Sequence, residues 1–175
     1  EDYLWVGTHQ GLDQINIETG ESKAYPNISK SIYYRNNSSV LSVNKTSTGH
    51  LLIGTVDGLY KVEMDEQAGK VKNMVPINYN DYYFKKQETN NVYIIQEADD
   101  GKIWIGTKKG LAILNPDFTP AGFYTRIEND ISSLPNNTVR FILQDSEGQI
   151  WVGTEGGVSM AIEETKLLLK YADNP

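Results

Sequence analysis

The chain has 175 residues, of which 16 are Lys or Arg and 23 are Asp or Glu, so its formal net charge is −7. This length suits about one domain, and the acidic charge excludes the basic field with which proteins attract nucleic acid or anionic lipid surfaces. The absence of Cys excludes disulfides, thiolate nucleophiles and Cys-ligated zinc, and two histidines are too few for most metal sites.

A repeated motif runs through the chain from its N-terminus to its C-terminal region. The segment LWVGTHQGL at residues 4–12 recurs as LLIGTVDGL at 51–59, IWIGTKKGL at 103–111 and IWVGTEGGV at 150–158. The first glycines of the four copies, Gly7, Gly54, Gly106 and Gly153, are 47, 52 and 47 residues apart. Because β-propeller blades recur every 40–50 residues or so, this spacing predicts propeller blades.

Each unit contains short β-enriched runs separated by turn signals. A Val opens the first run nine residues before a turn glycine, at Val40, Val92 and Val139. In the last unit the four runs read VRFILQD, IWVGT, VSMAI and KLLLKY. No run of ten or more residues has a convincing 3.6-residue period. The sequence therefore predicts an all-β fold in which each unit is a four-stranded antiparallel sheet.

The units divide the chain at approximately residues 1–26, 39–76, 91–125 and 138–171, and the first unit lacks its opening strand. An open arc of blades leaves apolar faces and a bare strand edge uncovered. We therefore interpret residues 1–175 as a partial β-propeller, a fragment of a longer one. Two alternatives are a closed four-bladed ring and a larger ring completed by a second copy of the chain.

The repeated Gly and Trp have a packing explanation. The second run of each unit is continuously apolar, as expected for a strand buried on both faces between neighbouring blades. Trp5, Trp104 and Trp151 share one register position and supply broad contact area, whereas Leu52 takes that position in the second unit and predicts a looser blade. The first glycine is expected to allow close approach of an adjacent backbone. We assign these residues to the core rather than to a site.

The repeat also resembles a known family. The pattern V-x(8)-G-x-[LI]-W-[VI]-G-T-x-x-G-[LV], followed by an aromatic residue near the end of the unit and by the SLPNN stretch at 133–137, is similar to the two-component regulator propeller repeat. The resemblance covers essentially the whole chain in four copies. It implies a seven-bladed propeller in the periplasmic sensor region of a hybrid two-component system of the Bacteroidetes type, followed by an immunoglobulin-like domain, a membrane helix, a histidine kinase and a DNA-binding output.

This resemblance implies that the chain senses a ligand, such as an oligosaccharide, and signals to a C-terminal histidine kinase. It implies that this region has no catalytic activity, while kinase activity lies outside the chain. The sequence has no apolar run near the roughly 20 residues that cross a bilayer and no signal segment at its N-terminus. We therefore expect residues 1–175 to be soluble, with membrane attachment only through a domain outside them. We expect no cofactor and no metal.

The direction of the strands locates a candidate ligand surface. The turn between the second and third strands and the link to the next blade lie at the same end of every blade, so the long links at 27–39, 76–91 and 126–137 share one end. Long loops on a rigid scaffold often carry function. These links concentrate aromatic rings, which suit sugar faces, and polar groups, which suit hydroxyls. The candidate ligand-binding residues are Tyr33, Tyr34, Arg35, Asn36, Tyr79, Tyr82, Tyr83 and Arg126.

Other functions remain open at this point. The same mixture of Tyr and Arg suits a protein partner, so the chain could be a propeller scaffold for subunit interaction, including a homodimer through propeller faces or edges. A propeller lyase or hydrolase acting on glycans is a second alternative, but no nucleophile elbow or other catalytic motif is present. The acidic pairs Asp99–Asp100 and Asp145–Glu147 sit at hairpin turns, where turn chemistry explains them; calcium binding or acid–base work is the alternative.

Overall fold

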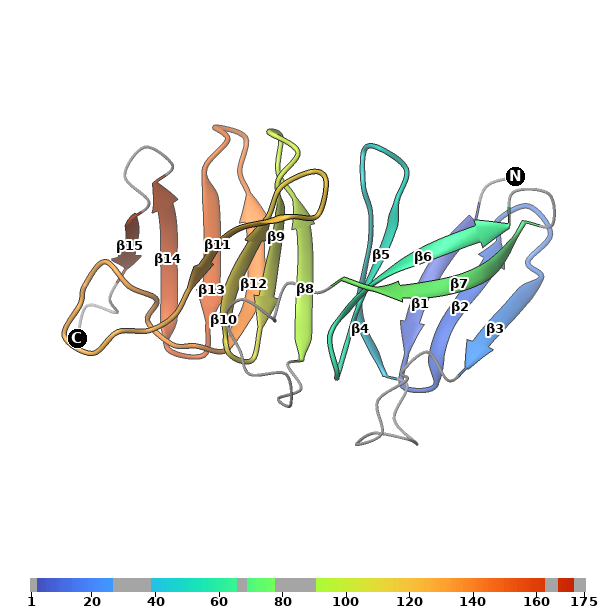
Figure 1. Cartoon of the computed structure of the whole chain (residues 1–175), viewed down its shortest axis with the longest axis horizontal. Coiled ribbons are helices and arrows are strands. Elements are labelled where there is room, and N and C mark those ends of the chain that lie inside the picture. Colours follow the sequence, from blue (N-terminus) through green and yellow to red (C-terminus); the bar gives the residue numbers. More distant parts are fainter. Residues whose placement is uncertain (1–2, 27–38, 66–68, 78–90, 163–166, 172–175) are drawn as a thin grey trace.

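The chain forms four antiparallel β-sheets in the computed structural model (Figure 1). The structure describes residues 3–26, 39–65, 69–77, 91–162 and 167–171, and only the backbone of the last strand is described. Within these ranges every regular element is a strand, which confirms the predicted all-β fold. No helix in them has the length and apolarity that a membrane span requires.

We number the sheets as blades 1 to 4 in chain order. Strand order within each blade follows the chain, and neighbouring strands are antiparallel. Blade 1 has three strands and the others have four, which confirms the predicted blade type. The strands are β1 (Tyr3–Thr8), β2 (Gly11–Asn16) and β3 (Ser22–Pro26); β4 (Val40–Lys45), β5 (Leu51–Thr55), β6 (Leu59–Asp65) and β7 (Lys70–Pro76); β8 (Val92–Glu97), β9 (Ile103–Thr107), β10 (Gly110–Leu114) and β11 (Pro120–Tyr124); and β12 (Val139–Gln144), β13 (Ile150–Thr154), β14 (Gly157–Ile162) and β15 (Leu167–Tyr171).

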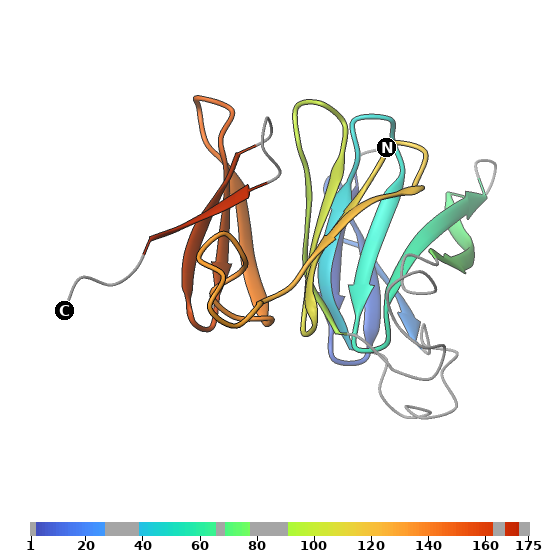
Figure 2. The same ribbon diagram turned by 60° about the vertical axis from the view of Figure 1, so that its left-hand side comes forward.

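The blades follow one another in an open arc. Blade 1 lies at one end of Figure 1 and blade 4 at the other; in the view turned by 60°, blade 1 overlaps blade 2 and remains apart from blade 4 (Figures 1 and 2). Strand β8 contacts both β4 and β12, so the first strands of blades 2, 3 and 4 adjoin one another. The arrangement therefore differs from the closed four-bladed ring that the sequence had left open.

The hydrophobic core lies between blades rather than within one. Trp104 and Leu111 of blade 3 face blade 4 and pack in one cluster with Ile150 and Val152. Two equivalent clusters join blade 2 to blade 3 and blade 1 to blade 2. Strands β5 and β9 are buried along their whole length, as predicted, whereas the equivalent strands β1 and β13 of the two outer blades are only partly buried. The looser second blade is not observed, because Leu52 is completely buried against blade 3.

The first glycine of the motif in blades 1 to 3 allows the next blade to approach, which confirms its predicted role there. A Cβ atom on Gly106 would lie 2.8 Å from Cγ1 of Val139, the first residue of the next blade. Gly7 and Gly54 meet Val40 and Val92 in the same way. Any side chain at these positions would push neighbouring blades apart.

The Thr and the second glycine of the motif close the turn between the second and third strands. The Thr hydroxyl donates to the carbonyl oxygen of that glycine in all four blades, at 3.2 Å for Thr8, 3.0 Å for Thr55, and 2.8 Å for Thr107 and Thr154. The four glycines have φ between 131° and 145°, a region that residues with a Cβ atom rarely adopt. The G-T-x-x-G pattern thus encodes one turn, repeated four times.

Each blade has two ends, and we name them for what they carry. The loop end carries the turns that follow Thr8, Thr55, Thr107 and Thr154 together with the links between blades; the hairpin end carries the turns at 46–50, 98–102 and 145–149. At the loop end, Lys108 N donates to Asn91 O and Glu155 N donates to Thr138 O, each at 3.0 Å. These bonds confirm that turns and links meet at one end, which is at the bottom of Figure 1.

Candidate functional site

The sequence predicts that the ligand residues lie at the loop end, but most of them fall outside the described residues. Tyr33, Tyr34, Arg35, Asn36, Tyr79, Tyr82 and Tyr83 fall in the ranges 27–38 and 78–90. Arg126 is described and is exposed, and its backbone N–H donates to Asn137 Oδ1 at 2.6 Å. The assignment of these eight residues to a ligand site therefore remains a prediction.

The link at 126–137 is described in full and is a closed loop. The Ser133 hydroxyl accepts from Ile127 N at 2.9 Å and donates to Asp130 O at 2.8 Å, while Leu134 is fully buried. The loop also reaches the last turn of the loop end, because a Cβ atom on Gly156 would lie 3.1 Å from Pro135 O. The SLPNN stretch therefore fixes the link between blades 3 and 4 onto the loop end of blade 4.

A polar and aromatic group lies beside this loop, where blades 3 and 4 meet. The guanidinium Cζ of Arg140 lies 3.9 Å from the ring centroid of Tyr93. Arg140 Nε donates to Glu155 Oε1 at 2.9 Å, and Nη2 donates to the same oxygen. Asn91 Nδ2 donates to the Tyr93 hydroxyl at 3.4 Å. We call Tyr93, Arg140 and Glu155 the loop-end cluster.

The electrostatics of the loop-end cluster keep Arg140 charged. The hydrogen bond that Arg140 donates to Glu155 is the main reason why the pKa of Arg140 is raised above its usual value. Both partners of the ion pair have side chains that are 49% exposed. An exposed pair of this kind stabilises a protein by only about 0–1 kcal/mol, so either partner can exchange its contact for another at little cost.

Further described groups at the loop end hold a turn in place or join it to the start of the next blade. In blade 2, Thr55 Oγ1 donates to Asp57 Oδ1 at 2.6 Å, and the Tyr60 hydroxyl donates to the same oxygen at 3.3 Å. Burial is the main cause that raises the pKa of Tyr60, so this phenol stays protonated. In blade 1, His9 Nδ1 lies 3.2 Å from Ser39 Oγ. These contacts shape the turns and favour the loop-end cluster as the place where a ligand can bind.

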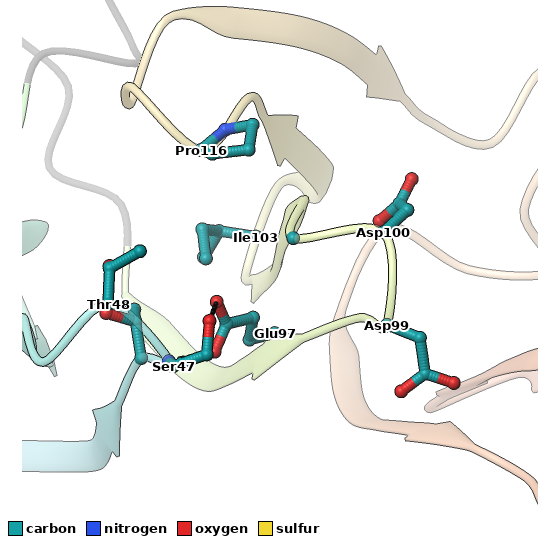
Figure 3. A pocket seen from close by; sticks show the side chains of 9 residues that line it. Ser47, Thr48, Glu97, Asp99, Asp100, Ile103 and Pro116 are labelled. Carbon is teal, nitrogen blue, oxygen red and sulfur yellow. Dashed lines mark hydrogen bonds between the residues drawn. The ribbon is translucent and has the colours of Figure 1, made fainter.

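The hairpin end carries a cavity of about 300 Å³ between blades 2 and 3 (Figure 3). Ser47 N donates to Glu97 Oε2 at 2.6 Å and Ser47 Oγ donates to Glu97 Oε1 at 2.8 Å, while the Asp99 side chain points away from this pair. Asp99 N donates to Gln144 Oε1 of blade 4 at 2.8 Å, so the same kind of bond joins blades 3 and 4. The cavity is therefore bordered by a repeated inter-blade hydrogen bond.

The acidic turn residues at this end act as the turn chemistry predicts. Asp145 accepts from Trp151 Nε1 at 2.7 Å and from Gln149 N at 2.9 Å, and the bond from Trp151 is the main reason why its pKa is lowered. Asp100 pairs with Lys102. Across the described ranges, no three His, Cys, Asp or Glu side chains are placed to hold a metal ion.

Sequence reasoning missed Tyr93 and Arg140, which it treated as ordinary members of inner strands. Each follows the Val that opens its strand, and the register shifts by one residue at that point, between Val92 and Ile94 and between Val139 and Phe141. A register shift depends on the pairing of two strands and is invisible in one strand's sequence. The sequence did contain one indication of these positions: the residue after the Val differs in each copy, whereas the Val is the same in all three.

Comparisons with known proteins agree with the repeat. The two-component regulator propeller family matches residues 86–109 and 133–156. The extracellular domain of the hybrid two-component system BT4673 of B. thetaiotaomicron is 25% identical, with a TM-score of 0.73, over 91% of this chain and 20% of that one. The chain thus spans about a fifth of the length of that structure. No curated protein matches the sequence.

Two further structures resemble the chain in fold. PorZ of the type-IX secretion system of Porphyromonas gingivalis is 14% identical, with a TM-score of 0.66, over 97% of this chain and 26% of that one. Virginiamycin B lyase of Staphylococcus aureus is 17% identical, with a TM-score of 0.64, over 99% of this chain and 53% of that one. At these identities the likeness shows the propeller fold alone.

Proposed function

Because the chain carries two-component regulator propeller repeats, we propose that it belongs to the ligand-sensing, extracytoplasmic propeller of a hybrid two-component receptor. In this proposal the region is periplasmic, recognises an oligosaccharide and signals to a C-terminal histidine kinase that lies outside residues 1–175. The observation that carries the proposal is the repeat itself, matched in two blades and present in four copies. The chain has no catalytic role in this proposal.

The proposal includes further blades that complete a seven-bladed ring. Leu12, Leu59 and Leu111 hold one repeat position in blades 1 to 3 and are at most 1% exposed, because the following blade covers each of them. Val158 holds that position in blade 4 and is 41% exposed, beside Phe141 at 53%. A blade packed on this face would cover both side chains, which supports a longer propeller.

The alternative of a scaffold for protein or subunit interaction has one observation in its favour. Ile127 and Ile131 of the closed loop are 57% and 85% exposed at the loop end. A partner that docks on this end, including a second copy of the receptor, would bury them. Ligand binding and subunit contact are compatible, since a sensor can signal by a change in subunit packing. The likeness to virginiamycin B lyase concerns the fold and does not favour the enzyme alternative.

Two tyrosines that the sequence predicts as ligand residues provide a direct test of oligosaccharide recognition. In the complete extracytoplasmic region, the double variant Tyr33→Ala, Tyr83→Ala should weaken oligosaccharide binding in calorimetric titrations and leave the melting temperature nearly unchanged. The matched variant Tyr33→Phe, Tyr83→Phe keeps the ring faces and should retain most of the affinity. The proposed function would be refuted if the wild type bound no oligosaccharide from a panel of neutral and acidic ones. Equal loss of affinity and stability would place the tyrosines in the core instead.

A further inference from the structure

A β-bulge recurs at the same position in the first strand of three blades. The register shifts between Val40 and Ser42 in β4, and in β8 and β12 it shifts at the equivalent residues. The extra residues are Leu41, Tyr93 and Arg140. Bulges commonly redirect a side chain at the rim of a sheet or beside a functional site. Three bulges in one register therefore display one extra residue per blade along the loop end.

The residues on either side of the bulge differ in what the fold requires of them. Val40, Val92 and Val139 are 6%, 0% and 0% exposed and pack against the glycine of the preceding blade. The bulged residue does not pack against that glycine. Leu41 and Tyr93 are partly buried, and Arg140 is exposed. Its chemistry changes from aliphatic to aromatic to cationic across the three blades. A position that does not pack against the glycine of the preceding blade, and that varies between repeats, is suited to recognition.

Adjacent bulged residues make contact with each other. Strands β8 and β12 adjoin, and the Arg140 guanidinium lies over the Tyr93 ring. This stacking leaves the edge of the guanidinium to the carboxylate of Glu155, which accepts both Arg140 bonds on a single oxygen. A guanidinium can instead offer two parallel N–H groups to the two oxygens of one carboxylate, and that geometry is the stronger one. Glu155 therefore binds Arg140 in a geometry weaker than the paired one, and both side chains are about half exposed.

We propose that Arg140 and Tyr93 form a subsite for the carboxylate of an acidic oligosaccharide, with Glu155 as the internal carboxylate that such a ligand replaces. The inference rests on the proposed function and adds to it the class of sugar, one that contains uronic acid. Arg140 binds the ligand carboxylate with two hydrogen bonds, and Tyr93 holds the guanidinium plane by stacking. Glu155 returns to Arg140 when the ligand leaves, so the guanidinium is paired with a carboxylate in both states.

The test compares acidic with neutral oligosaccharides in calorimetric titrations of the complete extracytoplasmic region. Arg140→Ala should weaken binding of a uronic acid oligomer at least about tenfold, since two hydrogen bonds to a charged group are lost. Arg140→Lys should bind the uronic acid oligomer little better than Arg140→Ala, because an ammonium group cannot make the paired geometry. Glu155→Gln should strengthen the same binding severalfold, because it removes the competing charge. The opposite signs of the Arg140 and Glu155 effects distinguish a ligand subsite from a structural ion pair.

Lys23 supplies the matched control. Its Nζ lies 5.0 Å from the ring centroid of Tyr25 on the outer strand of blade 1, so Lys23→Ala removes a cation from a tyrosine far from the subsite and should leave affinity unchanged. Uronic acid binding that is unaffected by both Arg140→Ala and Glu155→Gln overturns the subsite and leaves the sensor function standing. If the wild type binds neutral oligosaccharides and no acidic ones, the subsite is likewise overturned and the sensor function is not. Failure of every oligosaccharide to bind the wild type overturns the proposed ligand class as well.

Discussion

Replacing Gly106 with Ala tests how tightly the blades are stacked. The added Cβ would lie 2.4 Å from Ile94 Cγ2, 2.8 Å from Val139 Cγ1 and 3.1 Å from Val139 O. Carbon atoms are in favourable contact at about 3.5–4.0 Å, so blade 4 must move away by roughly 1 Å, which forfeits up to about half of the dispersion energy across the seam. Overpacking of this kind costs about 1–3 kcal/mol. The clash with backbone places Gly106→Ala near 3 kcal/mol.

Gly153 is the matched control, because it holds the same repeat position in blade 4. The three atoms nearest to a Cβ there all belong to Phe141, the first at 3.2 Å, and Phe141 is 53% exposed and can give way. In residues 1–175 we expect Gly153→Ala to cost less than about 1 kcal/mol. Urea unfolding monitored by tryptophan fluorescence measures both values, with an unchanged slope showing that only stability has changed. Equal losses in the two variants would refute the account of blade stacking.

Three other substitutions report on separate contacts. Trp104→Ala should cost about 3–5 kcal/mol through cavity formation, since Trp104 is 5% exposed between two blades, and a loss below about 1 kcal/mol in urea unfolding would contradict its place in the core. Glu97→Ala should cost about 1 kcal/mol by removing the bond between blades 2 and 3, whereas Glu97→Gln should keep most of the stability, because Gln144 accepts the equivalent bond in the next blade. The carboxylate of Asp145 has a lowered pKa in the folded chain, mainly through Trp151, so its stabilising effect is complete above its unfolded pKa, about 3.9, and is lost as the pH falls through the folded pKa. Asp145→Asn should therefore flatten the fall in melting temperature with pH below about 4, and an unchanged profile would show that the bond to Trp151 is not formed in solution.

Most of the fold was predictable because it repeats. A packing rule that acts once leaves little trace in a sequence, but here Gly7, Gly54 and Gly106 record the same contact with the next blade. The Thr and second Gly of each motif likewise record one turn, although the hydroxyl bond that explains the pair emerged only with the backbone in place. The expectation of a looser second blade was wrong. It rested on Leu52 being smaller than the Trp of the other copies, but the neighbours of Leu52 bury it completely.

The candidate site was harder to predict than the fold. Composition drew attention to aromatic links at the loop end, and the end itself followed correctly from strand direction. The cluster of Tyr93, Arg140 and Glu155 joins two blades and depends on a register shift in each of two strands. Neither the shift nor the contact between blades leaves a mark on any single segment of sequence.

The sequence alone therefore determined the all-β class, the blade motif and the end of the blades that carries the links, because each follows from local patterns that recur at a fixed spacing. Only the tertiary structure decided that the four blades form an open arc, that bonds such as Ser47 to Glu97 join neighbouring blades, and that Arg140 lies on Tyr93. The physical reason is that these features depend on the angle and distance between sheets. Those quantities are set by side chains from two blades at once, more than 40 residues apart in the chain.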